Sequence, residues 1–227
     1  MKKYILLALV IGQISTAKAQ INGAGGLATD VNGRVLRPSK MTFEDGSPYL
    51  NNSFMKAVVN SNGDKLFTFE KARFNLMESQ LEHEFNGQTY AITDEIKEFQ
   101  IESKDEEGRL VTKKFRRNFA DYEAFNAKTF YELLFDGKVK LLKKTSVRMS
   151  AHPKALSTQI EQSYFQNDSY FIVDKTGKLT LFVKGKTDVI ALISSRKEQL
   201  MAFVKKEELS LKMPTDIAIL MAYADSL

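Results

Sequence analysis

Two short alternating runs meet at an Asn-Gly pair in Leu81-Glu82-His83-Glu84-Phe85-Asn86-Gly87-Gln88-Thr89-Tyr90-Ala91-Ile92. Successive side chains of a strand point to opposite faces, so Leu81, His83 and Phe85 share one face and the two glutamates share the other. Asn and Gly both tolerate positive φ, which a two-residue type I′ turn requires at both of its positions. The pattern predicts a tight antiparallel hairpin with one apolar face and one wet face, and a structural role for His83.

Turn signals of the same kind recur around this hairpin, between short runs rich in Phe, Val, Thr and Tyr. They are Asn62-Gly63, Asp105-Glu106-Glu107-Gly108 and Asp136-Gly137. Closely spaced hairpins favour an antiparallel meander, sandwich or open barrel over a parallel sheet. We therefore predict an antiparallel β domain over residues 46–148. A change in the parity of the apolar residues predicts a bulge or break near Glu70-Lys71, with a strand on each side.

The second part of the chain has a different pattern. Residues 149–168 lose the alternation and gain Ser, Gln and Asn, which predicts a linker and a domain boundary. Residues 169–227 begin with a further hairpin around Thr176-Gly177 and then change to helical spacing. The fold class is therefore α+β, mainly antiparallel β, with a small αβ segment at the C-terminus.

About three short helices are predicted in this segment. Thr187 is placed to cap the first helix. Ser195 and Glu198 form a capping box for the second, in which each side chain bonds to the other's backbone N–H. Pro214 suits the first turn of the third.

The N-terminus has the three parts of a secretory signal peptide. Two lysines precede an apolar run over residues 4–11, and Ala17-Lys18-Ala19 precedes the expected cleavage point. We predict a signal peptide over residues 1–19, a flexible arm over residues 20–45, and export to the periplasm, the outer membrane or the extracellular space. The apolar run is shorter than the roughly 20 residues of a membrane helix, and no later stretch reaches that length.

Composition excludes several classes of function. The 227 residues include no cysteine, which excludes disulfide scaffolds, zinc knuckles, iron–sulfur sites and thiol catalysis. Removal of residues 1–19 takes away three lysines and no acid, so the formal net charge falls from +5 to +2. Nucleic-acid binding usually needs a strongly basic domain, and no such partner is expected. No metal spacing, cofactor loop or nucleophile elbow is found, so we predict no catalytic, cofactor-binding or metal-binding residue.

Two groups of side chains are candidates for binding. Clustered bases on two expected strands are either a site for an anionic glycan or lipid, or solvated charges that protect strand edges and are offset by nearby acids. These bases are Lys113, Lys114, Arg116, Arg117, Lys138 and Lys140. The tyrosines are either a ligand platform or core and rim residues. They include Tyr49, Tyr122, Tyr131, Tyr164, Tyr170 and Tyr223.

Several motifs resemble an uncharacterised family of secreted Bacteroidota proteins. They are Gly46-Ser47-Pro48-Tyr49-Leu50, Arg73-Phe74-Asn75, the run from Phe130 to Lys144 and the three C-terminal helices. The similarity covers most of residues 46–227 and implies an envelope or extracellular location without any activity. Such sequences often have glycine where Ala57 stands and tyrosine where Phe74 stands.

Three functions stay open. The first is a non-catalytic envelope protein that binds or scaffolds an envelope protein, an anionic glycan or a lipid. The second is a hydrolase that uses unmarked Asp and Glu carboxylates, and the third is a carrier of a small apolar ligand. A filled core favours the scaffold, a cleft lined by two or more acids favours the hydrolase, and a closed barrel with an apolar cavity of about 300 Å³ or more favours the carrier.

Overall fold

The structure is a computed structural model that describes residues 46–63, 65–92, 95–105, 107–153 and 160–227, together with the strand residues 28–29 and 35–36. The predicted signal peptide, residues 1–19, and most of the predicted arm, residues 20–45, lie outside the described residues. Strands β1 (Ala28–Thr29) and β2 (Val35–Leu36) pair with each other.

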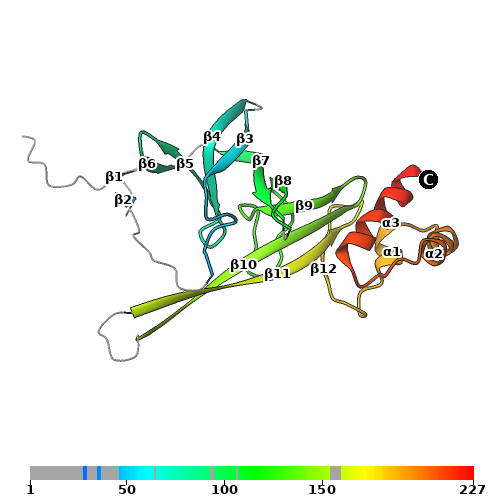
Figure 1. The fold of residues 1–227 in the computed structure, drawn as a ribbon. Helices are drawn as coiled ribbons and strands as arrows, with labels where there is room; N and C mark the ends of the chain where they lie inside the picture. Colours follow the sequence, from blue (N-terminus) through cyan, green and yellow to red (C-terminus); the bar gives the residue numbers. More distant parts are fainter. Residues whose placement is uncertain are drawn as a thin grey trace, which may run out of the picture.

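Ten further strands form one open antiparallel sheet in the order β12-β11-β10-β9-β8-β7-β3-β4-β5-β6 (Figure 1). The strands are β3 (Met55–Ser61), β4 (Leu66–Asn75), β5 (Gln80–Phe85), β6 (Gln88–Ala91), β7 (Ile96–Lys104), β8 (Leu110–Arg116), β9 (Tyr131–Asp136), β10 (Lys140–Pro153), β11 (Ile160–Val173) and β12 (Leu179–Phe182). The helices are α1 (Val189–Ile193), α2 (Lys197–Lys206) and α3 (Pro214–Ser226). They gather at one end of the molecule, where α3 contacts β9 and β10. The predicted fold class is confirmed.

The predicted hairpin turns are confirmed. Asn86 and Gly87 join β5 to β6 with φ angles of 52° and 74°, as a type I′ turn requires. The β3–β4 pairing gains one residue on β4 between Phe69 and Ala72, so the bulge predicted near Glu70-Lys71 is present. The prediction of a separate strand on each side is wrong, because β4 continues through the bulge as one strand.

One core cluster packs against the β3–β8 part of the sheet. Phe74, Phe99, Phe115 and Phe130 are at most 5% exposed, and their ring centroids lie 4.9 to 6.0 Å apart. A second cluster lies between the helices and the β9–β12 end of the sheet, and a third lies under the loop of residues 117–130. Burial of these side chains is the main favourable term in folding.

Two of the three predicted helix starts differ in the structure. Pro214 begins α3 as predicted. Asp188 caps α1 by accepting a hydrogen bond from the Ala191 backbone N–H, whereas the hydroxyl of Thr187 is bonded to backbone groups of the preceding turn. The capping box of Ser195 is wrong, because α2 begins at Lys197 without a side-chain cap.

The predicted linker at residues 149–168 is wrong for the residues that the structure describes. β10 and β11 pair over fourteen residues each, without a register shift, and so include residues 149–153 and 160–168. β9 flanks this hairpin only at Lys140–Lys143, and β12 flanks it only at Tyr170–Val173. The remainder, Lys144–Pro153 with Ile160–Ser169, is called the hairpin arm, and Figure 1 shows it extending away from the helices.

The segment Gly46–Leu50, here called the clasp, joins β4 to the hairpin arm. Its backbone exchanges hydrogen bonds with the end of β4, from Leu50 N to Phe74 O and from Leu76 N to Pro48 O, both 2.9 Å. On its other side, the Gln166 amide donates to the carbonyl oxygens of Ser47 and Tyr49 at 3.0 and 3.2 Å. The motif that carries the family resemblance therefore connects two distant parts of the sheet.

The clasp also buries a face that the sequence predicts to be wet. The Arg73 guanidinium lies 3.6 Å from the centroid of the Tyr49 ring and pairs with Glu82 at 2.9 Å. Glu82 is consequently only 9% exposed. The prediction of a wet face is wrong at this position, because a segment more than thirty residues away in sequence covers it.

Gly46→Ala should destabilise the protein more than Gly87→Ala. The two glycines have φ of +71° and +74°, so alanine incurs a similar backbone cost of about 1 kcal/mol at each. A Cβ on Gly46 would also lie 2.0 Å from the carbonyl oxygen of Tyr164, whereas nothing lies within 4 Å at Gly87. This contact should remove a further 1 to 3 kcal/mol, roughly, from the free energy of unfolding measured in urea. Equal losses in the two variants would show that the clasp does not pack closely on the arm.

Candidate functional site: the hairpin groove

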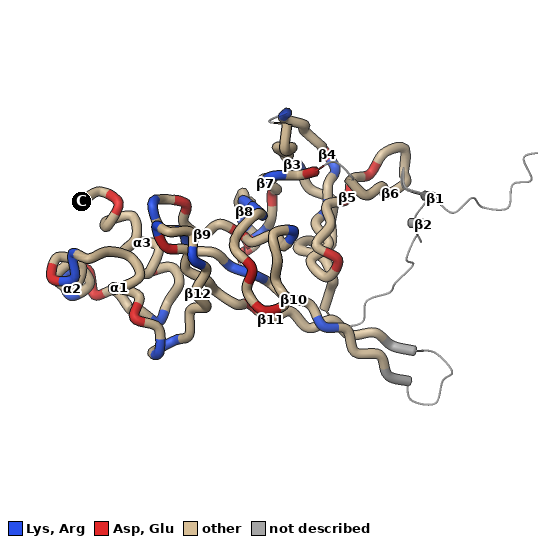
Figure 2. The backbone as a smooth tube through the Cα atoms, turned by 180° about the vertical axis from the view of Figure 1, so that it is seen from behind, with Lys and Arg blue, Asp and Glu red and all other residues tan. Residues whose placement is uncertain are grey.

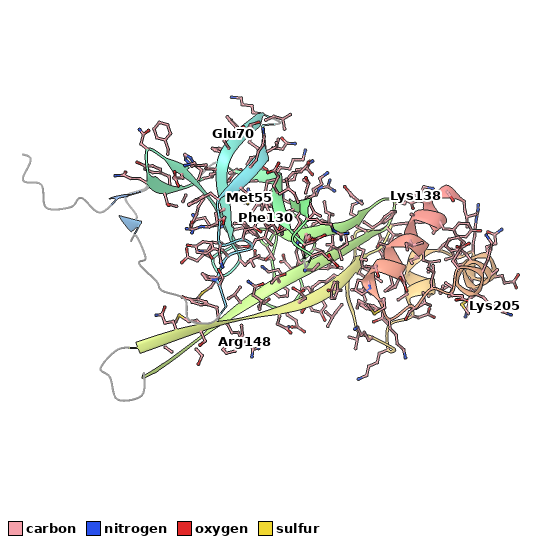
Figure 3. All side chains as sticks on the ribbon, in the orientation of Figure 1. Met55, Glu70, Phe130, Lys138, Arg148 and Lys205 are labelled. Atoms are coloured by element: carbon pink, nitrogen blue, oxygen red, sulfur yellow. The ribbon has the colours of Figure 1, made fainter. Side chains whose placement is uncertain are left out.

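A groove of about 590 Å³ lies between one face of β10–β12 and the loop of residues 117–130. It is called the hairpin groove. Its apolar lining comes from the loop, β11 and β12, and consists of Tyr122, Phe125, Phe165, Phe171 and Leu181. Its polar lining consists of Glu123, Ser146, Arg148, Gln166, Asn167 and Ser169. Figure 3 shows Arg148 on the hairpin arm, away from the helices.

The aromatic side of the groove is held by the fold of the loop. Tyr122 and Phe125 exchange two backbone hydrogen bonds of 2.9 Å, and Asn118 N donates to Ala127 O at 2.9 Å. The rings of Tyr122 and Phe125 meet the buried Phe171 ring edge to face, with centroids 5.3 and 6.0 Å apart. These contacts fix the rings before any ligand binds, which lowers the entropic cost of binding.

The polar side of the groove is largely unoccupied by the protein's own hydrogen bonds. Within the described part of the chain, no hydrogen bond or ion pair is made by the side chains of Glu123, Ser146, Arg148, Asn167 or Ser169. Hydroxyl, amide, carboxylate and guanidinium groups are all represented, so both donors and acceptors are available to a ligand.

A buried base lies beside these groups. Lys144 is the cross-strand partner of Ser169 and shares a strand face with Ser146 and Arg148. Its side chain is buried, and that burial lowers the pKa of its ammonium group. Lys144 makes no ion pair with the described residues, so both it and Arg148 are uncompensated bases on this face.

A second depression, of about 600 Å³, surrounds the clasp. Two of its polar side chains already have partners, since the Gln166 amide donates to two clasp carbonyl oxygens and the Ser47 hydroxyl accepts from Tyr49 N. We therefore place the candidate site in the hairpin groove.

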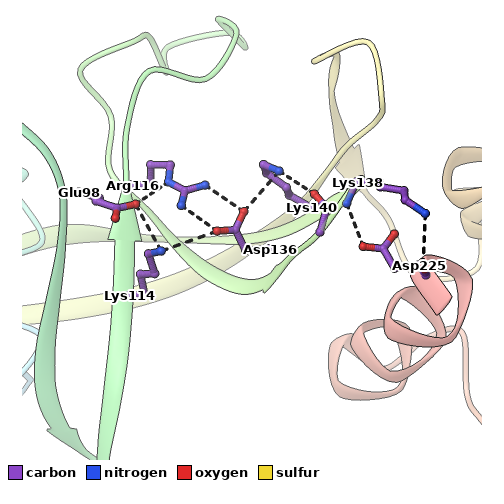
Figure 4. Close-up of polar contacts among 8 residues, drawn as sticks. Glu98, Lys114, Arg116, Asp136, Lys138, Lys140 and Asp225 are labelled. Carbon is purple, nitrogen blue, oxygen red and sulfur yellow. Dashed lines mark hydrogen bonds and ion pairs between the residues drawn. The ribbon is translucent and has the colours of Figure 1, made fainter. Parts of the chain in front are cut away.

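The predicted basic cluster is largely paired with acids. Arg116 donates to Glu98 at 2.8 Å and to Asp136 at 2.7 Å (Figure 4). Lys114 lies 3.4 Å from Glu98, and Lys140 lies 3.3 Å from Asp136. Figure 2 shows basic and acidic positions interspersed along these strands.

The other three predicted bases have separate surroundings. Lys113 lies 3.6 Å from Glu132. The backbone N–H of Lys138 donates to Asp225 at 2.9 Å, and its ammonium group to the Asp225 carbonyl oxygen at 3.2 Å (Figure 4). The Arg117 guanidinium lies 5.5 Å from the centroid of the Phe130 ring. A polyanion would have to displace acids that belong to the protein, and the polyanion site stays a prediction.

The tyrosines are distributed over several environments. Tyr122 alone of the six lines the hairpin groove. Burial and the charge of Asp121 raise the pKa of Tyr131 to about 12, and its buried hydroxyl has no hydrogen-bond partner among the described residues. Tyr49 lies in the clasp, and the Tyr223 ring stacks on Phe203 at 3.9 Å. His83 lies between the rings of Phe69 and Tyr90, a structural environment.

Sequence reasoning missed Arg148, Phe165 and Asn167 as site residues. Phe165 and Asn167 lie in the predicted linker, and Arg148 is the last residue of the predicted β domain. The three share one face of the long hairpin, because Phe165 is the direct cross-strand partner of Arg148 and Asn167 lies two residues further along the same strand.

Comparison of the chain with models of protein families, with curated proteins and with solved structures finds no match. In the described part of the chain, no cluster of three or more His, Asp and Glu side chains is arranged to hold a metal ion. None of the described helices is long and apolar enough to cross a membrane.

Arg116→Gln should destabilise the protein at neutral pH, and less so in acid. Burial raises the pKa of Glu98 and of Asp136, but the hydrogen bonds and charge of Arg116 outweigh it, so the pKa of each carboxyl is lowered. The ionised carboxylates therefore stabilise the folded protein above their pKa in the unfolded chain, which is about 4. This stabilisation is lost as the pH falls through their lowered pKa values in the folded protein. We expect Arg116→Gln to lower the free energy of unfolding by about 1 to 2 kcal/mol at pH 7, a loss between those typical of exposed and of buried ion pairs.

The measurement is the free energy of unfolding of both proteins between pH 7 and about pH 3. Arg109→Gln is the matched control, because Arg109 also pairs with two acids but its side chain is 73% exposed. Its loss should be smaller at pH 7. If the free energy of unfolding differed between the wild type and Arg116→Gln by the same amount at every pH, the effect would not come from ion pairs.

Proposed function

We propose that the protein is an exported, non-catalytic binding module whose ligand occupies the hairpin groove. The observation that carries this proposal is the combination of fixed aromatic rings with polar side chains that have no partner among the described residues. Ligand sites typically pair an apolar lining with a few convergent polar groups.

The proposed location rests on the N-terminal sequence. The signal-peptide pattern of residues 1–19 and the resemblance to secreted proteins both support export, and thus a ligand in the cell envelope or outside the cell. Among the possible ligands in the cell envelope, a protein partner is better supported than an anionic glycan or lipid. The reason is that acids of the sheet already form ion pairs with most of the predicted bases.

The shape of the sheet gives less support to the other two functions. A carrier needs an enclosed apolar cavity, whereas this sheet is open and its main clusters are packed with side chains. A hydrolase of the carboxylate type needs two acids in one cleft, and Glu123 is the one acid among the residues that line the hairpin groove.

The test uses the mature protein against two probes, a phage library of random dodecapeptides and an array of envelope glycans. Arg148→Ala and Asn167→Ala should each weaken binding of the selected ligand about tenfold, the loss expected for one or two polar contacts. Lys205→Ala, on the exposed face of α2 at the far end of the molecule, is the control and should leave binding unchanged (Figure 3).

Two outcomes would overturn the proposal. The first is a ligand whose affinity is the same for the wild-type protein and both groove variants. The second is hydrolysis of a glycan, ester or peptide substrate that is lost in Glu123→Gln.

A further inference from the structure

Lys143 and Lys144 are neighbours on β10, but their side chains have different electrostatic surroundings because successive strand residues point to opposite faces. The ammonium nitrogen of Lys143 lies 3.0 Å from Asp168 and 3.7 Å from Glu132. Burial lowers the pKa of Lys143, but these acids outweigh it and raise that pKa overall. On the other face, the Lys144 ammonium group has no ion pair or hydrogen bond with the described residues, and burial lowers its pKa. The fold compensates the first charge and leaves the second uncompensated.

The side chains around Lys144 on its own face are neutral. It shares that face with Leu142 and Ser146 of β10, and its cross-strand partner is Ser169. The residue is only 7% exposed, but its Nζ atom is not among the fully buried polar atoms without a partner, so it keeps access to solvent. Burying a charge without an opposite partner costs free energy. The position of this lysine is therefore not explained by the stability of the free protein.

Arg148 is the second uncompensated base of this face. It lies four residues further along β10, a separation of about 13 Å along an extended strand. Its side chain is exposed, lines the hairpin groove and makes no ion pair with the described residues. Glu123, the one acid in the groove lining, pairs with neither base. Between the two bases stand Ser146 and its cross-strand partner Asn167, so the face presents two positive charges separated by neutral polar groups.

An extended polypeptide can match each part of this face. Its side chains four residues apart point the same way and are also separated by about 13 Å. Acidic side chains at two such positions would lie opposite Lys144 and Arg148, whereas a single small anion could engage only one of these bases. An apolar side chain of the same segment would contact the exposed Phe165 ring and the fixed rings of Tyr122 and Phe125.

We propose that the ligand is an acidic, extended segment of a partner protein, with one carboxylate bound by Lys144, a second bound by Arg148 and an apolar side chain packed against the aromatic rings of the hairpin groove. This proposal rests on the proposed function and names its ligand class. Hydrogen bonds between ionised partners are shorter and stronger than neutral ones. In the complex, the carboxylate would offset the cost of burying Lys144, which the free protein leaves uncompensated.

The first test is the composition of the peptides that bind. Dodecapeptides selected on the mature protein should be enriched in Asp and Glu, with two acids four positions apart and an apolar residue nearby. Replacing one of these acids in a selected peptide by its amide, Asn or Gln, should reduce affinity about tenfold. Added salt should weaken binding of the acidic peptide more than binding of its amide form.

Variants of the protein identify the bases that bind the peptide. Lys144→Met and Arg148→Gln should each reduce affinity for the acidic peptide about tenfold. Lys205→Gln is the charge-matched control, because it also removes one positive charge but lies on the exposed face of α2, at the far end of the molecule from Arg148 (Figure 3). Its affinity should stay within about threefold of the wild type, since exposed and distant charges contribute little.

The stability of the free protein separates a binding role of Lys144 from a structural one. Methionine is similar in length to lysine and carries no charge, so Lys144→Met should raise the urea midpoint of unfolding while it weakens binding. A structural lysine would give a lower midpoint instead. Arg148→Gln should leave the midpoint unchanged, because the Arg148 side chain is exposed and has no ionic partner among the described residues.

Several results would overturn this inference. They are selected peptides without an excess of acids, equal affinity of the acidic and amide forms, wild-type affinity in Lys144→Met, and a library that yields no peptide. The proposed function would survive any of the first three if Asn167→Ala still weakened binding. An anionic glycan whose binding depends on Lys144 and Arg148 would also overturn the inference, because it would assign these bases to another class of ligand in the same groove.

Discussion

The clasp sets where the hairpin arm lies, and the position of the candidate site depends on it. The arm is flanked by β9 and β12 only at its base, so little else in the sheet fixes its direction. Gln166 bonds to two carbonyl oxygens of the clasp, while Leu50 and Leu76 bond the same segment to the end of β4. Gly46 allows this approach because its position leaves no room for a Cβ beside the carbonyl oxygen of Tyr164. The edge of β11 is thereby held in one orientation relative to the body of the sheet.

Local chemistry made most of the hairpins predictable, whereas the arm and the candidate site depended on contacts between distant residues. The Asn86-Gly87 turn needs only two residues that tolerate positive φ, and the bulge near Glu70-Lys71 follows from the parity of the apolar side chains. The arm is a strand pair whose faces are both polar over much of its length, so it lacks the alternation that marks a half-buried strand. Its Ser, Gln and Asn content therefore resembles a linker. Likewise, the burial of Glu82 could not be predicted from its strand, because the clasp that covers it comes from another part of the chain.

The basic residues show why a cluster in sequence is a poor guide to surface charge. Lys114 and Arg116 lie close together on β8, yet their partners Glu98 and Asp136 come from the two neighbouring strands. The order of strands in the sheet brings these opposite charges together, and that order is a property of the whole fold. Arg148, which is not part of the predicted basic cluster, is the base that lines the groove without an ionic partner among the described residues. A candidate site is better judged by which charges the fold leaves unpaired than by how many occur in a run.

The exposed Phe165 side chain on β11 bears on whether the hairpin groove is a ligand site. More than a quarter of the chain is charged, so lysine and glutamate are common at exposed strand positions elsewhere. A charged residue could stand at Phe165 without disturbing the core, because that side chain is more than half exposed. An exposed aromatic side chain stands there instead, next to fixed rings and unpaired polar groups. A ligand in the hairpin groove would account for the exposed aromatic ring and the unpaired polar groups together, whereas a purely structural arm accounts for neither.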